Sequence, residues 1–160
     1  MRIGVVSDTH NQLRNVARIV ALLNAAGVAR VVHTGDITQA RTLRVLGGLD
    51  APLHGVYGNN DEREELGPAA ASLGFALHEG RLELHWAERR IVVVHDPRDL
   101  EGLVLGAGDV ALHGHTHRRV IEERSGALVF NPGECAGHLP GHNAVGVLDL
   151  GTLRPEILSF

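Results

Sequence analysis

Histidine and aspartate recur at short spacings in this chain. The stretch Gly114 to His117 reads GHTH, and Asp8 and His10 stand two residues apart in the stretch SDTH. Imidazole nitrogens and carboxylate oxygens together suit first-row transition metals, whereas calcium prefers oxygen alone. One such residue by itself more often has a structural role than a metal-binding one. The chemistry therefore depends on whether similar residues recur at equivalent places in the fold.

Each of these polar groups follows an apolar segment with the composition of a buried strand. The segments are Ile3 to Ser7, Ala29 to Thr34, Leu53 to Tyr57, Ile91 to Val94 and Val110 to Leu112. The polar residues after them are, in the same order, Asp8 with His10, Asp36, Asn59, His95, and His115 with His117. Loops converge at the carboxyl ends of the strands of α/β sheets, where ligands bind. We therefore expect these seven side chains to surround one small volume.

The first three segments alternate with helical patterns. A helix that stops at Gly27 is predicted from apolar residues at helical spacing, namely Leu13, Val16, Val20 and Leu23. Thr38 is expected to cap a second helix that ends near Leu46. A third helix is expected to begin with an acidic turn that includes Asp61 and Glu62. Three such units predict a sheet covered by helices and joined by right-handed crossovers.

The second half of the chain is richer in strands and turn signals. Hairpins are predicted at Glu79-Gly80, Ser125-Gly126 and Gly151-Thr152. They would join Phe75–His78 to Arg81–Trp86, Val120–Arg124 to Ala127–Phe130, and Val145–Leu150 to Leu153–Leu158. No linker or low-complexity tract divides the chain. The expected architecture is α/β, with two mixed β-sheets packed as a sandwich flanked by helices, in one domain over residues 1–160.

Composition restricts the class of protein. The 160 residues are 44% hydrophobic and 21% charged, as in ordinary globular proteins. The formal net charge of -4 argues against binding of long DNA or RNA. Cys135 is the single cysteine, which excludes an internal disulfide and favours a reducing compartment. No basic leader or membrane-spanning apolar segment is evident, so we expect a cytoplasmic protein.

The number of donors favours two metal ions over one. Seven donors exceed the four that a tetrahedral zinc site needs, so two ions that share a ligand are the more economical arrangement. Asp36 is the natural bridge because a carboxylate has two oxygens. Paired divalent ions can activate a bridging water and stabilise an in-line displacement at phosphorus. Manganese is the ion we expect first, and nickel, cobalt, iron and zinc are alternatives.

The ordered motifs resemble one known family. They are SDTH, GD at Gly35-Asp36, GNND at Gly58 to Asp61, His95 after an apolar strand, GHTH, and NPG at Asn131 to Gly133. The set is similar to the calcineurin-like metallophosphoesterases, and in particular to the small phosphodiesterase subfamily that includes the retromer subunit Vps29. The resemblance covers nearly the whole chain and implies a β-sandwich flanked by helices with a dinuclear metal centre.

The resemblance also implies residue roles. It places one ion on Asp8, His10, Asp36 and His117, and the other on Asp36, Asn59, His95 and His115. It implies a phosphodiesterase in which a metal-bridging hydroxide attacks phosphorus, with Asp36, Asn59 and His95 in the catalytic machinery. His113 is left without a role in this scheme.

Three positions depart from the family pattern. Many of its phosphatases have a histidine general acid after the metal-binding asparagine. Here that residue is Asn60, which we expect to contact substrate but which cannot supply the proton. Asp96 stands where glycine is common, and either orients His95 or points into solvent. Glu134 stands where a small hydroxyl residue is common, and is expected to alter the pocket rim.

Other interpretations remain open at this point. Asp8 and Asn59 could cap helices, Asp36 could form an Asx-turn, and Arg118 and Arg119 are expected at the surface. A structural or surface role is expected for seven histidines, namely His33, His54, His78, His85, His113, His138 and His142. Cys135 is expected to serve packing.

The activity also has alternatives. They are a phosphomonoesterase of broad specificity and a non-catalytic metal-binding scaffold. For the preferred phosphodiesterase, the expected substrate is a small phosphodiester or a nucleotide, with no membrane and no long nucleic acid as partner. Edge strands of a small sandwich can pair between chains, so a homodimer is an open alternative.

Overall fold

The computed structural model describes residues 1–160, and its strands form two sheets. The first sheet contains β1 (Arg2–Val6), β2 (Arg30–His33), β3 (Leu53–Val56), β4 (Ala76–His78), β10 (Ala144–Asp149) and β11 (Arg154–Ser159). The second contains β5 (Leu82–Trp86), β6 (Arg89–Val93), β7 (Val110–Leu112), β8 (Val120–Arg124) and β9 (Ala127–Asn131). The strand orders are β11-β10-β1-β2-β3-β4 and β5-β6-β7-β9-β8.

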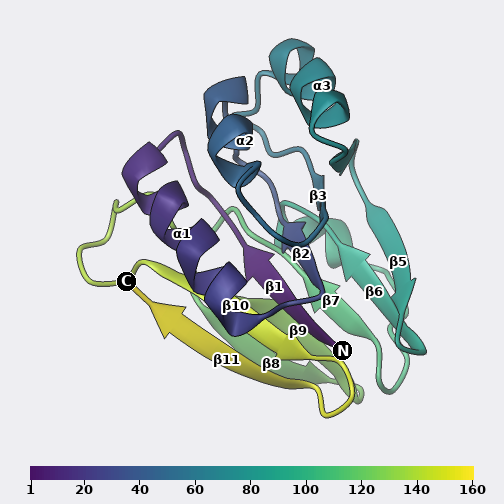
Figure 1. Ribbon diagram of the computed structural model, residues 1–160. Coiled ribbons are helices and arrows are strands. Elements are labelled where there is room, and N and C mark those ends of the chain that lie inside the picture. Colours follow the sequence, from purple (N-terminus) through teal and green to yellow (C-terminus); the bar gives the residue numbers. More distant parts are fainter.

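Helices cover the first sheet. α1 (Leu13–Ala26), α2 (Ala40–Leu46) and α3 (Arg63–Ser72) lie in one layer along the outer face of this sheet, and the second sheet packs against its other face (Figure 1). The outer face of the second sheet carries only a short 3-10 helix, η1 (Pro97–Leu100), with its connecting loops. The structure thus confirms the expected α/β sandwich, with all three α-helices on one side.

Strand β1 lies at the centre of this arrangement. Ile3 and Val5 belong to the core between the sheets, whereas Val6 belongs to the core beneath the helices. All three side chains are fully buried. Successive side chains of a strand point to opposite faces, so β1 contributes apolar side chains to both cores. This burial on two sides holds the end of β1 in place.

Parallel pairing brings several strand ends to one edge. β1, β2, β3 and β4 are parallel neighbours, and so are β6, β7 and β9 in the second sheet. The loops after β1, β2 and β3 must therefore meet, and so must those after β6 and β7. The sequence pattern predicted this convergence of the loops that carry the polar residues.

One predicted hairpin is wrong. Ala76–His78 pairs in parallel with β3, and the chain then crosses at Glu79-Gly80 to the other sheet, where Leu82 joins the core between the sheets. The true partner of β5 is β6, across Ala87 and Glu88. Both turn residues have positive φ, of 49° and 60°, without being glycine or asparagine, so the sequence carried no turn signal there.

Two helix starts also differ from expectation. α2 begins after Gln39 rather than at a Thr38 cap, and α3 begins at Arg63. Asp61 lies before α3, where its carboxylate accepts hydrogen bonds from the backbone N–H groups of Thr38 (2.6 Å) and Gly58 (2.7 Å). Asp61 therefore ties the loop after β3 to the loop after β2, a tertiary role that local capping rules do not anticipate.

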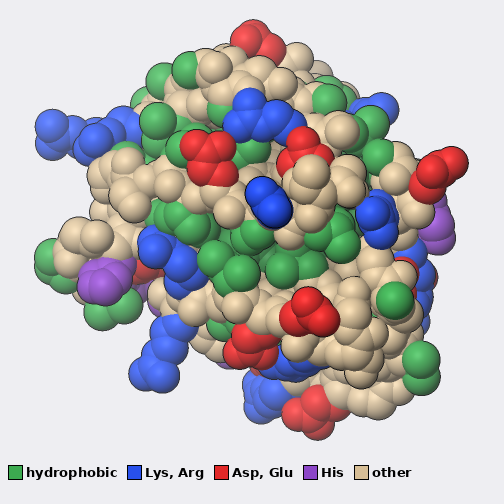
Figure 2. Space-filling model, turned by 90° about the horizontal axis from the view of Figure 1, so that it is seen from below, with side chains coloured by type: hydrophobic (Ala, Val, Ile, Leu, Met, Phe, Trp, Pro, Cys, Tyr) green, Lys and Arg blue, Asp and Glu red, His purple; other side chains and the backbone are tan.

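The other two hairpins are confirmed. β8 and β9 pair across Ser125-Gly126, and β10 and β11 pair across a turn that extends from Leu150 to Leu153. No helix is both long enough and apolar enough to cross a membrane. On the face seen from below, apolar side chains gather in the middle with charged side chains around them (Figure 2).

Candidate metal centre

All seven predicted donors lie in the loops that follow β1, β2, β3, β6 and β7. Backbone hydrogen bonds hold these loops together. The N–H groups of Asp8 and His10 donate to the carbonyls of Gly35 (3.1 Å) and Asp36 (3.0 Å), and that of Gly114 donates to the carbonyl of His95 (3.0 Å). The backbone N–H of His115, in the loop after β7, also donates to the Asp8 carboxylate in the loop after β1, at 3.1 Å to Oδ2, and this joins the loops of the two sheets into one continuous site.

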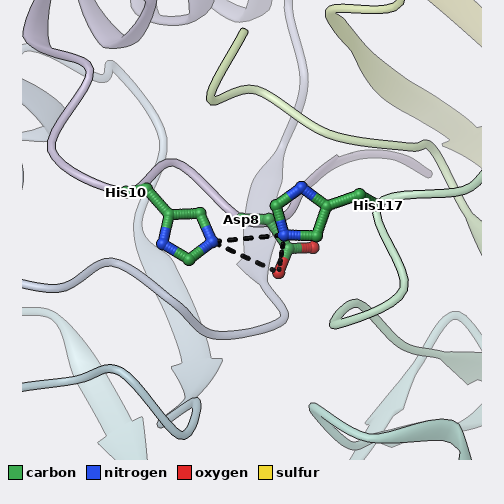
Figure 3. A group of neighbouring side chains, drawn as sticks. All are labelled: Asp8, His10 and His117. Carbon is green, nitrogen blue, oxygen red and sulfur yellow. Dashed lines mark hydrogen bonds and ion pairs between the residues drawn. The ribbon is translucent and has the colours of Figure 1, made fainter. Parts of the chain in front are cut away.

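Asp8, His10 and His117 form the first set of donors (Figure 3). The Nε2 atoms of the two histidines lie 3.3 Å apart. Asp8 Oδ1 lies 3.7 Å from His117 Nε2 and 4.0 Å from His10 Nε2. The two rings stack with centroids 5.1 Å apart, so both Nε2 atoms face the same carboxylate.

Asn59, His95 and His115 form the second set. Asn59 Oδ1 lies 2.9 Å from His95 Nε2 and 3.0 Å from His115 Nδ1, and these two nitrogens are 3.2 Å apart. The spacing of GHTH now has a structural explanation, because His115 and His117 point into different sets. His113 turns away and is buried beside Asn131.

Asp36 lies between the two sets. Its Oδ2 atom is 3.4 Å from His10 Nε2 and 3.5 Å from His95 Nε2. Asn60 holds this carboxylate, because its backbone N–H donates to Oδ1 and its side-chain amide donates to Oδ2, each at 2.9 Å. Burial opposes ionisation of Asp36, but the two hydrogen bonds from Asn60 and the nearby His95 and His10 lower its pKa below the usual value.

The tautomers of two histidines are determined by their partners. Thr34 O and the Glu134 carboxylate can only accept, so His95 Nδ1 (2.9 Å) and His117 Nδ1 (2.9 Å) carry the protons. The lone pairs of both Nε2 atoms then face the other donors. Without a cation, a ring N–H of His10 or His115 can donate to one of these facing acceptors, and the acceptors left without a proton between them repel one another, which a bound cation would relieve.

The donor spacing fits such a cation. Ligand atoms bound at about 2.1 Å to one ion lie about 3.0 to 3.4 Å from each other in octahedral or tetrahedral geometry. Most of the donor separations above, from 2.9 Å to 3.7 Å, are close to this range. The donor chemistry and the spacing both suit divalent transition metals.

Asp8 is the most deeply buried of the donors. Ser7 Oγ donates to its Oδ2, and the backbone N–H of His115 donates to both of its oxygens. Even so, burial raises the pKa of Asp8 above the usual value. Burial likewise lowers the pKa of His10, which favours the neutral form that a metal requires.

Close approach of the loops depends on glycine. A Cβ atom at Gly58 would overlap the Asp36 backbone and carboxylate. A Cβ at Gly35 would lie 2.7 Å from His95 Nδ1, and Gly35 has a φ of +103°. The glycines of the GD and GNND motifs are thus needed where the loops after β2 and β3 pass each other.

Glu134 has a role that sequence reasoning missed. The pocket-rim assignment is wrong, because the side chain is fully buried and its Oε2 accepts from His117 Nδ1 at 2.9 Å. Its Oε1 accepts from the backbone N–H of Leu139 at 2.5 Å. Glu134 therefore orients His117, as carboxylates commonly orient metal-bound histidines. Its place after NPG was the only signal in the sequence.

His138 is exposed, as expected for a surface residue, but it also adjoins the site. It comes from the same loop, and its exposed ring stacks on both His10 and His117, with centroids 5.4 Å and 5.1 Å away. Asp96 takes neither of its expected roles. It caps η1 and pairs with Arg98 at 2.6 Å, and its nearest histidine in the site is His115 at 3.7 Å.

The remaining histidines lie outside the two donor sets. His33 is buried beneath the site, and burial lowers its pKa to about 3, which keeps it neutral. His54 contacts Trp86 edge-on at 5.1 Å. Cys135 is fully buried, as expected for a packing residue.

Two cavities adjoin the donors. One of about 360 Å³, which we call the Arg98 cavity, is lined by Tyr57, Gly58, Asn59, Arg63, Gly80, His95, Asp96, Arg98, Asp99 and His115. The other, of about 220 Å³, which we call the Arg119 cavity, is lined by His117, Arg118, Arg119, Gly133, Leu139 and His142. A third cavity, of about 640 Å³, lies between α2 and α3 and contains none of the donors. Each donor set thus has its own adjoining space.

Because burial raises the pKa of Asp8, its ionised carboxylate should lower the folding stability of the metal-free protein at neutral pH. A carboxyl with a folded pKa above its unfolded value contributes stability below the unfolded pKa of about 4, and loses it as pH rises through the folded pKa. We therefore expect Asp8→Asn in EDTA to have a higher Tm than the wild type at pH 7, with a smaller difference near pH 4. Added manganese should then raise the Tm of the wild type by more than it raises the Tm of Asp8→Asn.

Thermal unfolding at both pH values measures this difference. Asp50→Asn, which removes an exposed carboxylate far from the site, is the matched control. A Tm of Asp8→Asn below that of the wild type in EDTA at pH 7 would contradict the interpretation.

The Glu134–His117 hydrogen bond should affect metal affinity. Glu134→Ala frees the His117 tautomer, and the loss of such a partner lowers affinity by about 10- to 100-fold. Glu134→Gln retains an acceptor oxygen, so it should bind metal more tightly than Glu134→Ala and less tightly than the wild type. Calorimetric titration of EDTA-stripped protein with manganese measures both variants, and their Tm values without metal control for folding. Equal affinity in Glu134→Ala and the wild type would show that His117 needs no partner.

The chain is similar to known proteins over nearly its whole length. The model of a family described as the calcineurin-like phosphoesterase superfamily domain matches residues 1–152. Phosphodiesterase MJ0936 of Methanocaldococcus jannaschii is 34% identical over 154 residues, which cover 93% of each protein.

Solved structures give the same result. An archaeal phosphodiesterase has a TM-score of 0.90 and 31% identity over 100% of both chains. YfcE, a phosphoesterase from E. coli, has a TM-score of 0.76 at 23% identity over 99% of both chains. Vps29 from Entamoeba histolytica has a TM-score of 0.68 at 19% identity over 99% of both chains. The similarity to YfcE and to Vps29 concerns the fold alone. By its motifs, its fold and the nearly complete family match, the chain belongs to the calcineurin-like phosphoesterase superfamily.

Proposed function

We propose that this protein is a metal-dependent phosphodiesterase with a dinuclear centre. The observation that carries the proposal is the position of Asp36 Oδ2, which is 3.4 Å from one donor set and 3.5 Å from the other. Such a shared carboxylate suits two ions in one site. The relative from M. jannaschii, 34% identical to this chain, is named a phosphodiesterase, which supports the same activity here.

The residues fit the metals in two groups. One ion would be held by Asp8, His10, Asp36 and His117, and the other by Asp36, Asn59, His95 and His115. We propose manganese first, with nickel, cobalt, iron and zinc as alternatives, because all accept imidazole and carboxylate together. When bound, two such ions supply a water nucleophile at neutral pH and neutralise charge on the phosphoryl oxygens.

The chain itself positions these groups. Thr34 O and Glu134 orient His95 and His117, and Asn60 orients Asp36. Ser7 and Cys135, two candidate nucleophiles close to Asp8 in the fold, have fully buried side chains. Hydrolysis by direct attack of water agrees best with this arrangement.

The leaving group receives no proton from position 60. Asn60 is an amide, and its side chain already donates to Asp36. We expect the leaving oxygen to depart with little acid assistance, which disfavours monoesters with poor leaving groups. A diester also has two organic arms, and two cavities adjoin the donors. Both features favour the diester as substrate.

We further propose one domain over residues 1–160 and a cytoplasmic location. β10 and β11 complete the sheet that contains β1, which supports a single folding unit. The lone cysteine is buried and unpaired, as is common in proteins of a reducing compartment.

Paired assays of two substrates test the activity. We expect bis-p-nitrophenyl phosphate to be cleaved faster than p-nitrophenyl phosphate with manganese, nickel or cobalt, and neither to be cleaved in EDTA. Asp36→Asn should lower diester turnover by about 100-fold or more, because both donor sets lose their shared carboxylate. Asn60→His should raise the monoester rate relative to the diester rate, because it introduces a proton donor.

The controls separate the alternatives. Asp50→Asn should keep the wild-type rates, and circular dichroism should show that Asp36→Asn remains folded. Faster cleavage of the monoester by the wild type would favour the phosphomonoesterase. Bound metal without cleavage of either ester would favour a scaffold, for which the apolar face in Figure 2 would be the first surface to examine.

A further inference from the structure

The Arg119 cavity is lined by two arginines, Arg118 and Arg119, that are not among the donors of the candidate metal centre. Arg118 and Arg119 are exposed residues of its lining, and neither guanidinium forms an ion pair with a carboxylate. The nearby carboxylate of Glu134 is fully buried and already accepts from His117 and the Leu139 backbone. Positive charge is therefore left uncompensated in this cavity, on a chain whose net charge is -4.

The shape of the cavity points to a small group. Its volume of about 220 Å³ is below the roughly 300 to 1,000 Å³ of pockets that hold whole small molecules. Arg119 is anchored, because its Nε donates to Pro132 O at 3.3 Å, and the ring of His142 adds a further polar group. Arginine presents several N–H donors in one plane and binds phosphate and carboxylate oxygens in pairs.

The Arg98 cavity differs in charge. Arg98 pairs with Asp96 at 2.6 Å, and Arg63 pairs with Glu79 at 2.8 Å. The Arg63 guanidinium also lies over the Tyr57 ring, 5.7 Å from its centroid. This cavity is therefore close to charge balance and offers an aromatic side chain, which suits an uncharged arm.

From these observations we propose that the Arg119 cavity binds a second anionic group on one arm of the substrate. The inference rests on the proposed phosphodiesterase function and narrows its substrate class. The substrate is a phosphodiester that carries an additional phosphate or carboxylate close to the scissile phosphate. Arg118 and Arg119 set this specificity, and the other arm lies in the Arg98 cavity.

Two matched probes test the inference. Thymidine 5′-(4-nitrophenyl phosphate) and its 3′-phosphorylated form have the same leaving group and differ only in one phosphate. For the wild type with manganese, we expect the added phosphate to raise kcat/KM about tenfold, mainly through KM, on the scale of one or two charge-assisted hydrogen bonds. The preference should weaken as salt is added, because the cavity is open to solvent.

Variants assign the preference to the cavity. The double variant Arg118→Gln/Arg119→Gln should lose the preference for the 3′-phosphorylated probe. The double variant Arg124→Gln/Arg154→Gln removes the same charge near the turns at the other ends of the strands, and should keep it. Thymidine 3′,5′-bisphosphate should inhibit the wild type more strongly than thymidine 5′-phosphate, and this difference should vanish only in the first variant.

The outcomes distinguish the two proposals. If the wild type cleaves neither probe nor bis-p-nitrophenyl phosphate, the phosphodiesterase proposal fails. If it cleaves both probes with equal kcat/KM, or if the preference survives in Arg118→Gln/Arg119→Gln, only the anionic subsite is overturned.

Discussion

The position of the Asp36 carboxylate is the constraint on which the rest of the site depends. One oxygen, Oδ2, faces both His10 and His95, so any shift of this group separates the two donor sets. Two hydrogen bonds from Asn60 hold it there, and the absence of a side chain at Gly58 leaves room for it. The residue that replaces the usual general acid thus has a structural task in this protein.

The backbone around the site is held in uncommon conformations. Five of the seven donors have φ in the left-handed region, namely Asp8 (52°), His10 (41°), Asp36 (58°), His115 (67°) and His117 (57°). Such conformations cost about 1 kcal/mol or more each for residues other than glycine. They persist because the strands before these loops are held in buried cores. The two-sided burial of β1 is therefore connected directly to the geometry of Asp8 and His10.

Electrostatics adds a second cost. The ionised Asp8 is unfavourable in its buried position, and the lone pairs of His95 and His117 face other acceptors. Bound cations would relieve both, and metal binding would then be coupled to folding stability. The uncompensated arginines of the Arg119 cavity lie just outside this region, in a space that His117 also lines.

The sequence by itself determined which residues could bind metal and where each stands along the chain, because the end of a buried strand is visible in local composition. It also determined the α/β sandwich, since alternating strand and helix patterns allow few arrangements. It did not reveal Glu134 and His138, whose loop folds back over His117 from a distant part of the chain. Nor did it reveal the separation of β4 from β5, because a turn signal at Glu79-Gly80 does not identify the sheet that each strand joins. Partners, tautomers, positive φ angles and the charge of each cavity were decided only by tertiary structure, because all of them depend on contacts between residues far apart in sequence.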